Sequence, residues 1–263
     1  MFDHSSPERE ATAPASHTSP TTSGRLARSI LPCLWSALFN GTIVLVLAAT
    51  ALTILAAIPI AVFRHVDPPG SMLMLAQSLG SQQIDQRWVP LSRISPNLVR
   101  AVIASEDNQF CSHNGVDLRE LEAVLEKVEQ NGEGSVRGGS TITMQVAKNL
   151  FLWKSRSVLR KAIEIPLALG LELMWPKERI MEVYLNIAEW GPGVFGAEAA
   201  AQYHFRKPAS RLTEREAALL AVALPNPFVR VPTRPNATVI KVSTVVERRA
   251  KVLGSRAACV VGR

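Results

Sequence analysis

The stretch Ala104-Ser-Glu-Asp-Asn-Gln-Phe-Cys-Ser-His-Asn-Gly115 places two adjacent carboxylates, an aromatic ring and an imidazole directly after an apolar run. The carboxylates are Glu106 and Asp107, and the imidazole is His113. Neighbouring acids at the end of an apolar helical turn repel each other and lose water, and both effects raise a carboxyl pKa towards the range useful for proton transfer. The alternative is an ordinary helix end with two solvated acids. The other motifs of the chain are needed to choose between a proton-transfer site and such a helix end.

An uncharged apolar segment lies near the N-terminus. Residues 29–63 contain no charged side chain. Their most apolar part, residues 41–63, would span roughly 35 Å as a helix, enough to cross a bilayer and too long for the core of a cleaved signal peptide. We therefore expect a single transmembrane helix at residues 29–63. The residues before it, 1–28, are rich in Ser, Thr, Pro and Ala and are expected to form a disordered tail.

The net charge of +7, from 29 Lys+Arg against 22 Asp+Glu, lies entirely after residue 63. Arg25 and Arg28 precede the apolar segment, and only Arg64 follows it closely. The positive-inside rule therefore puts the N-terminus in the cytoplasm and residues 64–263 outside. Because the basic charge is exported and no aromatic–basic stacking pattern accompanies it, we expect no nucleic-acid partner.

The exported part is predicted to be mainly α-helical, because apolar residues recur at helical spacing and strand signals are few. Helices are expected at Leu98–Glu106, Leu118–Val128, the residues after Ser140, Ser157–Met174, Lys177–Asn186, Ala197–Tyr203 and Leu212–Leu224. Pro166 falls inside one of these segments and should kink that helix and tilt Glu164.

Three regions are expected after the transmembrane helix. Residues 64–100 are interpreted as an irregular, membrane-proximal connector, and residues 101–227 as the core. Residues 228–263 form a basic extension that either lies on anionic lipid or is a solvated, partly frayed end. The three cysteines, Cys33, Cys111 and Cys259, show no metal-site spacing, and the sequence does not decide whether the last two are bonded.

A second polar segment runs from Arg137 to Phe151, as Arg-Gly-Gly-Ser-Thr-Ile-Thr-Met-Gln-Val-Ala-Lys-Asn-Leu-Phe. Its glycines free the backbone, and Ser140 or Thr141 can cap the helix that follows. Thr141, Gln145 and Lys148 then share one helix face. A helix start with hydroxyls and a lysine is suited to bind an anionic oxygen. The spacing is not that of a nucleotide-binding loop. The alternative is an ordinary capped surface helix.

Arg160, Lys161 and Glu164 lie close together on the next predicted helix. A cation pair beside an acid suits an anionic substrate. The alternative is a surface salt bridge worth less than about 1 kcal/mol.

These segments together resemble a known family. The motifs that carry the resemblance are Glu106-Asp-x-x-Phe-x-x-His-x-Gly115, Gly138-Gly-Ser-Thr-Ile-Thr-x-Gln-x-x-Lys-Asn149, Arg160-Lys-x-x-Glu164, Lys177-x-Arg-Ile-x-Glu-x-Tyr-Leu-Asn186, Gly193-x-x-Gly-x-x-Ala-Ala200 and the Leu-Pro-Asn-Pro that ends at Pro227. In this order and spacing they are similar to the successive motifs of the family-51 peptidoglycan glycosyltransferases. The resemblance runs from about Trp88 to the C-terminal region and leaves no room for a transpeptidase domain, as in the monofunctional biosynthetic enzymes.

The resemblance implies a lysozyme-like helical glycosyltransferase lobe with a smaller mobile lobe near the membrane. It implies that the 4-hydroxyl of one lipid-linked disaccharide-peptide (lipid II) attacks the anomeric carbon of a growing glycan, whose leaving group is polyprenyl pyrophosphate. The product is a β-1,4 bond, formed with inversion. Lipid II, the lipid-linked glycan and the bacterial inner membrane are the implied partners, and other wall-synthesis proteins stay open.

The resemblance also assigns roles to residues. Glu106 is the expected general base, and Glu164 matches the second essential acid. Glu164 either orients the neighbouring cations or holds a divalent ion (Mg²⁺ or Mn²⁺) on the pyrophosphate, and the sequence requires no other cofactor. The expected substrate-binding residues are Asp107, Ser140, Thr141, Gln145, Lys148, Asn149, Arg160 and Lys161. Of these, Asp107 is expected to support its loop, together with His113, rather than to react.

Two competing functions are weighed against this one. A lysozyme or lytic transglycosylase would cleave glycan, but it has no use for cations aimed at a pyrophosphate. A catalytically silent, membrane-anchored scaffold for wall synthesis is the other. Two positions depart from the family pattern: Met144 replaces a frequent glutamine, and Tyr203-His-Phe-Arg206 replaces a more usual Tyr-Phe-Gly.

Overall fold

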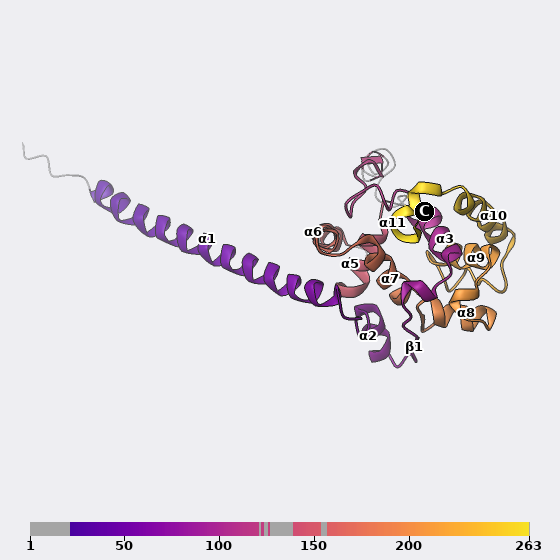
Figure 1. Ribbon diagram of the computed structural model, residues 1–263. Helices are drawn as coiled ribbons and strands as arrows, with labels where there is room; N and C mark the ends of the chain where they lie inside the picture. The colour runs from indigo at the N-terminus through magenta and orange to yellow at the C-terminus, as the bar shows by residue number, and fades with distance from the viewer. Residues whose placement is uncertain (1–21, 121, 124–125, 127–138, 154–156, 263) are drawn as a thin grey trace, which may run out of the picture. The chain divides into compact units, whose positions relative to one another are not determined.

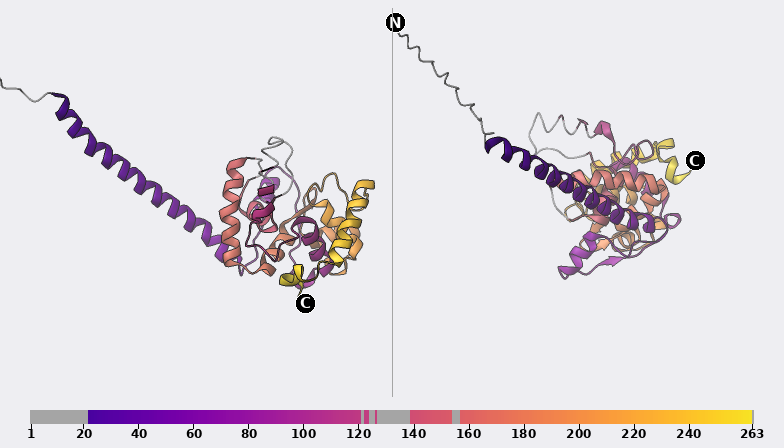
Figure 2. Two further views of the ribbon diagram at one scale, coloured as in Figure 1. Left: turned by 90° about the horizontal axis from the view of Figure 1, so that it is seen from above. Right: turned by 90° about the vertical axis from the view of Figure 1, so that its left-hand side faces the viewer.

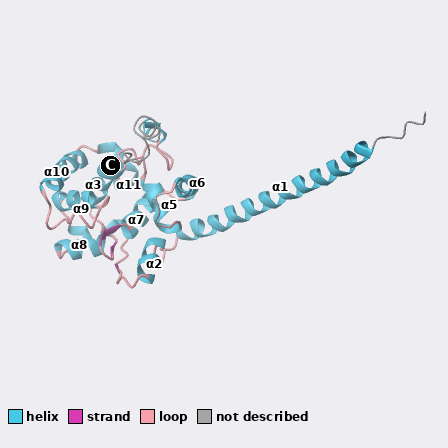
Figure 3. Cartoon of the chain, turned by 180° about the vertical axis from the view of Figure 1, so that it is seen from behind, coloured by secondary structure: helices cyan, strands magenta, loops and turns pink. Residues whose placement is uncertain are grey.

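The computed structural model is mainly helical, as the sequence predicts (Figure 1). In the part of the chain that the structure describes, strands are confined to three short segments, which Figure 3 separates by colour from the helices. The residues that the structure describes are 22–120, 122–123, 126, 139–153 and 157–262. The predicted helix Leu118–Val128 falls largely outside them.

Helix α1 runs over Thr22–Phe63 and contains the predicted apolar segment. Its part Phe39–Phe63 is long and apolar enough to cross a membrane. The helix begins within the tail that was expected to be disordered, so that expectation is wrong for residues 22–28. Extending an established helix by one residue costs little, and residues 22–28 contain no proline to stop it. Residues 1–21 of the tail lie outside the described part.

A compact unit spans Leu55–Arg263, so the expected connector and the expected extension are parts of one folded unit with the core. The connector also contains a helix that was not predicted, α2 (Met72–Leu79). The side chain of Ser71 caps α2 by accepting a hydrogen bond from the amide of Met74 at 3.2 Å. A small sheet begins in the connector as well.

That sheet has the strand order β1-β3-β2, with β1 at Asp85–Gln86, β2 at Glu189–Gly191 and β3 at Val194–Phe195. Strand β1 is parallel to β3, and β2 is antiparallel to it. Gly196 follows β3 with φ +84°, and an added Cβ there would come within 2.9 Å of the carbonyl oxygen of Asn186. Glycine is therefore required for the close turn from the sheet into the next helix.

Two groups of helices form the core. In the first, α3 (Pro96–Glu106), α9 (Glu214–Ala223) and α10 (Ala237–Lys251) pack on one another. In the second, α5 (Ile142–Phe151) packs against α6 (Val158–Met174) and α7 (Lys177–Ile187). The completely buried side chains between these elements include Leu98, Phe110, Tyr184, Trp190 and Phe195. Short elements α8 (Ala197–Phe205) and η3 (Ala209–Arg211) pack together beside them.

The predicted helices from residue 98 onward that lie in the described part are confirmed within a few residues at each end. Helix α6 is continuous through Pro166, and the kink expected there stays a prediction. Ser157 caps α6 by accepting from the amide of Arg160 at 3.2 Å.

The basic C-terminal extension is helical and not a frayed end, which corrects that expectation, whereas its contact with anionic lipid stays a prediction. Helix α10 buries Val239, Ser243 and Val246, because these residues recur at helical spacing on the face turned to α3 and α9. Two short elements follow it, η4 (Gly254–Ala257) and α11 (Ala258–Val261). Figure 2 shows these yellow C-terminal helices beside the magenta α3 and the orange α9.

Candidate active site

Glu106 is the last residue of α3, where the sequence placed it. The Ser95 side chain starts this helix, and Pro96 occupies its first turn, where a missing amide proton is harmless. The carboxylate is half-buried, and the Nε2 atom of Gln145 donates a hydrogen bond to its Oε2 at 3.1 Å. The end of α3 therefore presents Glu106 directly to the side chains of α5.

Burial raises the pKa of Glu106 above its ordinary value. Hydrogen bonds from Gln145 and Ser105 oppose this effect, as do the charges of Lys148 and Arg230. The repulsion by Asp107 that the sequence suggested is not the cause. Glu106 thus keeps the raised pKa that a general base needs, through loss of water alone.

Asp107 is buried and holds the loop that follows α3. Its carboxylate accepts from the backbone amide of Ile142 at 2.9 Å, and both of its oxygens lie 3.0 Å from Nε2 of His113. The loop and the start of α5 are therefore joined through one carboxylate. This is the supporting role expected for Asp107 and His113.

Thr141 is the N-cap of α5, which settles the choice between the two candidate caps. Its hydroxyl donates to the carbonyl of Gly115 and accepts from the amide of Met144. The side chain is buried and holds the start of α5, and the substrate contact predicted for Thr141 stays a prediction. Gly115 has φ +90°, and a Cβ there would come within 2.9 Å of the carbonyl oxygen of Ala168.

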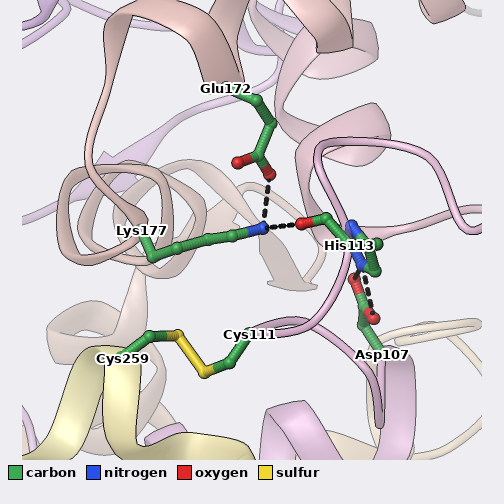
Figure 4. The surroundings of a disulfide bond; sticks show 6 residues. All are labelled: Asp107, Cys111, His113, Glu172, Lys177 and Cys259. Carbon is green, nitrogen blue, oxygen red and sulfur yellow. Dashed lines mark hydrogen bonds and ion pairs between the residues drawn. A yellow bond between two sulfur atoms is a disulfide. The ribbon is translucent and has the colours of Figure 1, made fainter.

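A second set of contacts fixes the same loop from α6 and α7 (Figure 4). The ammonium of Lys177 donates to the carbonyl of His113 and to Oε1 of Glu172, each at 2.7 Å, and lies 4.5 Å from the centre of the Phe110 ring. The Thr143 hydroxyl also donates to Glu172, at 2.6 Å. Sequence reasoning quoted Lys177 only as part of a motif and missed Glu172.

The predicted cation cluster is assembled at the N-terminal part of α6. Arg160 forms an ion pair with Glu164, and Lys161 Nζ lies 3.4 Å from the other Glu164 oxygen. Lys161 also donates to the hydroxyl of Ser140 at 2.6 Å. Glu164 is 2 % exposed, so its charge is balanced by the two cations rather than by water.

These cations affect one another. Burial, followed by the charges of Arg160 and Lys148, lowers the pKa of Lys161 to about 8. Burial and Arg160 also lower the pKa of Lys148, while Glu106 opposes the shift. Lys148 is therefore electrostatically coupled both to the candidate base and to the cation cluster.

Tyr184 completes a chain of hydrogen bonds that sequence reasoning did not predict. Its hydroxyl donates to Oε1 of Gln145 at 3.2 Å, while the Nε2 of the same amide donates to Glu106. Tyr184 is 1 % exposed, and burial raises its pKa well above the ordinary value. Tyr184 thus fixes the orientation of the Gln145 amide that donates to Glu106.

The remaining predicted positions are less central. Asn149 is half-buried in the last turn of α5. Met144, the departure from the family pattern, is 1 % exposed and belongs to the core. Arg206 is the C-cap of α8 in the left-handed conformation, with φ 55°, a conformation that glycine adopts more readily.

The helical unit presents a half-buried carboxylate close to lysine and arginine side chains. Such a site is typical of an enzyme that acts on an anionic substrate. Residues 73–255 match the family model described as Transglycosylase, and the chain belongs to that family. It is 52 % identical over 193 residues to the biosynthetic peptidoglycan transglycosylase of Agrobacterium fabrum, covering 73 % of this chain and 84 % of that protein. The corresponding protein of Rhizobium leguminosarum bv. trifolii is 50 % identical over 220 residues, covering 82 % and 92 %.

These comparisons confirm the resemblance found in the motifs. The protein is a peptidoglycan glycosyltransferase.

Proposed function

We propose that the protein polymerises lipid II into β-1,4-linked glycan with inversion, releasing polyprenyl pyrophosphate, and that Glu106 is the general base. One observation carries this proposal. Glu106 ends α3 with its carboxylate hydrogen-bonded to Gln145 of α5, and Lys148 lies about one turn further along the same helix. A proton acceptor and a site for a leaving anion are therefore adjacent.

The first task of the site is proton transfer. A sugar hydroxyl is a poor nucleophile, and a carboxylate that accepts its proton contributes roughly 10²–10⁴-fold to the rate. Glu106 is suited to this step because its pKa is raised by burial while the hydrogen bond from Gln145 fixes the carboxylate. The same amide is held by Tyr184, so the base needs little reorganisation when substrate binds.

The second task is to stabilise the departing pyrophosphate. Lys148, Arg160 and Lys161 supply positive charge, and Ser140 and Gln145 supply hydrogen bonds. Charge-assisted contacts of this kind strengthen as negative charge develops on the leaving oxygen. Asn149 lies in the last turn of α5, one residue after Lys148, and is retained as a peripheral substrate contact.

The arrangement around Glu164 favours its orienting role over a metal-binding role. Its buried carboxylate is paired with Arg160 and Lys161, which compete with any bound cation. Within residues 22–120, 122–123, 126, 139–153 and 157–262, no group of three or more His, Cys, Asp or Glu side chains is placed to hold a metal ion. We therefore assign Glu164 to positioning the two cations.

The proposed topology is a single pass through the inner membrane, with the N-terminus in the cytoplasm and residues 64–263 outside. The apolar part of α1 and the two arginines that precede it support this orientation. The disulfide between Cys111 and Cys259 suits an oxidising compartment. In this orientation, the proposed site lies on the outer side of the membrane, in whose leaflet both lipid-linked substrates would be anchored.

The experiment is polymerisation of lipid II by purified wild type, Glu106→Gln and Glu178→Gln. Glu178 is an exposed acid of α7 and serves as the matched control. Long glycan from the wild type and the control, with none from Glu106→Gln, would support the reaction and the base. Wild-type rates in Glu106→Gln would reject the base, and shortening of preformed glycan by the wild type would reject polymerisation.

A further inference from the structure

A disulfide ties the C-terminal end of the fold to the loop that begins at the candidate base (Figure 4). Cys111 lies in that loop, Cys259 lies in α11, and their Cα atoms are 5.7 Å apart across a sequence separation of 148 residues. The bond is therefore a long-range link between the last helix and the segment 107–115, which we name the catalytic loop.

The two ends of the catalytic loop are held independently of this bond. At its start, Asp107 accepts from the amide of Ile142, and near its end, Lys177 donates to the carbonyl of His113. The middle of the loop, residues 108–112, depends on other contacts. Its first anchor is Phe110, which is completely buried.

The other two anchors both come from the C-terminal segment. Asn108 accepts a hydrogen bond from Arg256 at 3.3 Å, and Cys111 is bonded to Cys259. The contact of Arg256 is exposed and contributes little in water. The disulfide is thus the strong link between the middle of the loop and the end of the chain.

Helix α11 is a short element that packs against α3 and α7. It is four residues long, buries no residue completely and has no side-chain cap. Its side chains Val260 and Val261 are only half-buried. The packing of α11 against α3 and α7 places Cys259, and the disulfide transmits this position to the middle of the catalytic loop.

The loop is coupled to the chemistry in two ways. Glu106 directly precedes Asp107 in the backbone, so a shift of the loop changes the direction of its side chain. Asp107 also holds the first amide of α5, the helix from which Gln145 reaches Glu106. Because a misplacement of about 1 Å at a reacting group can cost 10²-fold in rate, both couplings matter for turnover.

We propose that the Cys111–Cys259 disulfide is a positioning element of the catalytic loop, so that polymerisation is fast with the bond formed and slow with it reduced. The proposal rests on the assignment of Glu106 as the base. Each thiol gives up one proton and one electron when the S–S bond forms, and a disulfide-bearing oxidant of the dithiol–disulfide class takes them up and becomes a dithiol. Reduction by a dithiol is the reverse exchange.

The test uses the full chain in detergent, in a Cys33→Ser background that leaves only the two cysteines of interest. One half of the sample is reduced with dithiothreitol under native conditions, alkylated and checked for two modified thiols by mass spectrometry. A Cys111→Ser/Cys259→Ser variant is measured with and without the reductant, to separate the bond from other effects of dithiothreitol. For each sample, kcat and KM with lipid II are measured beside the far-ultraviolet circular dichroism.

The expected result is a reduced protein with unchanged dichroism, a kcat lowered roughly tenfold and a KM within about twofold, because the loop positions the base rather than the substrate. The serine variant should match the reduced protein and should not respond to dithiothreitol. Equal kcat values in oxidised and reduced protein would overturn the proposal. Loss of the circular dichroism signal on reduction would also overturn it, because the disulfide would then stabilise the whole fold rather than position the catalytic loop. An inactive oxidised protein would instead reject the proposed function.

Discussion

Replacing Lys177 by Met tests how firmly the catalytic loop is held. The ammonium of Lys177 donates to the carbonyl of His113 and to Glu172, each at 2.7 Å, and lies over Phe110. The Lys177 side chain is 15 % exposed and that of Glu172 is 7 % exposed, so water cannot replace these bonds. Methionine keeps the length of the apolar stem and removes only the charge and its hydrogen bonds.

Removing one partner of a buried ion pair typically costs about 3–5 kcal/mol, because the other charge is left uncompensated. In Lys177→Met the carboxylate of Glu172 keeps only the hydroxyl of Thr143. We therefore expect the free energy of unfolding to fall by about 3 kcal/mol or more.

The assay is urea denaturation of the full chain in detergent at pH 7, followed by fluorescence of the buried Trp175 and Trp190. Lys207→Met is the matched control, because the pair of Lys207 with Glu216 is 31 % and 20 % exposed and should contribute less than about 1 kcal/mol. Adding Glu172→Gln to Lys177→Met should recover part of the loss, since the unpaired charge is removed. A loss below about 1 kcal/mol in Lys177→Met would refute the reasoning, because the pair would then behave as a solvated one.

Three further predictions follow from single side chains. Because Lys161 has a pKa of about 8, its charge is lost as the pH rises above that value, so kcat/KM of the wild type should fall there. The Lys161→Arg variant should keep its activity to higher pH. A parallel fall of kcat/KM in both proteins would reject the role of Lys161. In Tyr184→Phe the amide of Gln145 loses the hydrogen bond that holds it, so its own hydrogen bond to Glu106, which lowers the pKa of Glu106, weakens. The acid limb of the kcat/KM profile should therefore move to higher pH. An unmoved limb would contradict the proposed chain of hydrogen bonds from Tyr184 through Gln145 to Glu106. Arg206→Gly should raise the free energy of unfolding, measured by urea denaturation, by about 1 kcal/mol. The left-handed conformation costs a non-glycine residue about this much. An unchanged or lower free energy of unfolding would show that Arg206 makes compensating contacts.

The helices of the core could be predicted because their apolar residues repeat over several turns. The end of α3 at Glu106 was predicted on the same basis, and it places the candidate base. Helix α2 has only eight residues, and the strands have two or three, so neither gives a clear period. These elements form through contacts with distant parts of the chain, such as the parallel pairing of β1 with β3.

The fold of the C-terminal extension was not predicted, because its charges were counted and its apolar spacing was not. Val239 and Val246 lie seven residues apart, which is two helical turns, and both are buried. The disulfide was open for a different reason. A sequence gives no distance between Cys111 and Cys259, and only the packing of α11 against α3 and α7 brings them together.

The site also shows why two adjacent acids have different roles. Asp107 is buried against His113 and the first amide of α5, so its charge is used to join two segments. Glu106 is half-buried and accepts hydrogen bonds from Gln145 and Ser105, which suits the proposed role of proton acceptor. An exchange of the two residues, Glu106→Asp with Asp107→Glu, would preserve composition and net charge. It should nevertheless abolish polymerisation, because the shorter acid cannot reach the proton and the longer one does not fit between His113 and α5.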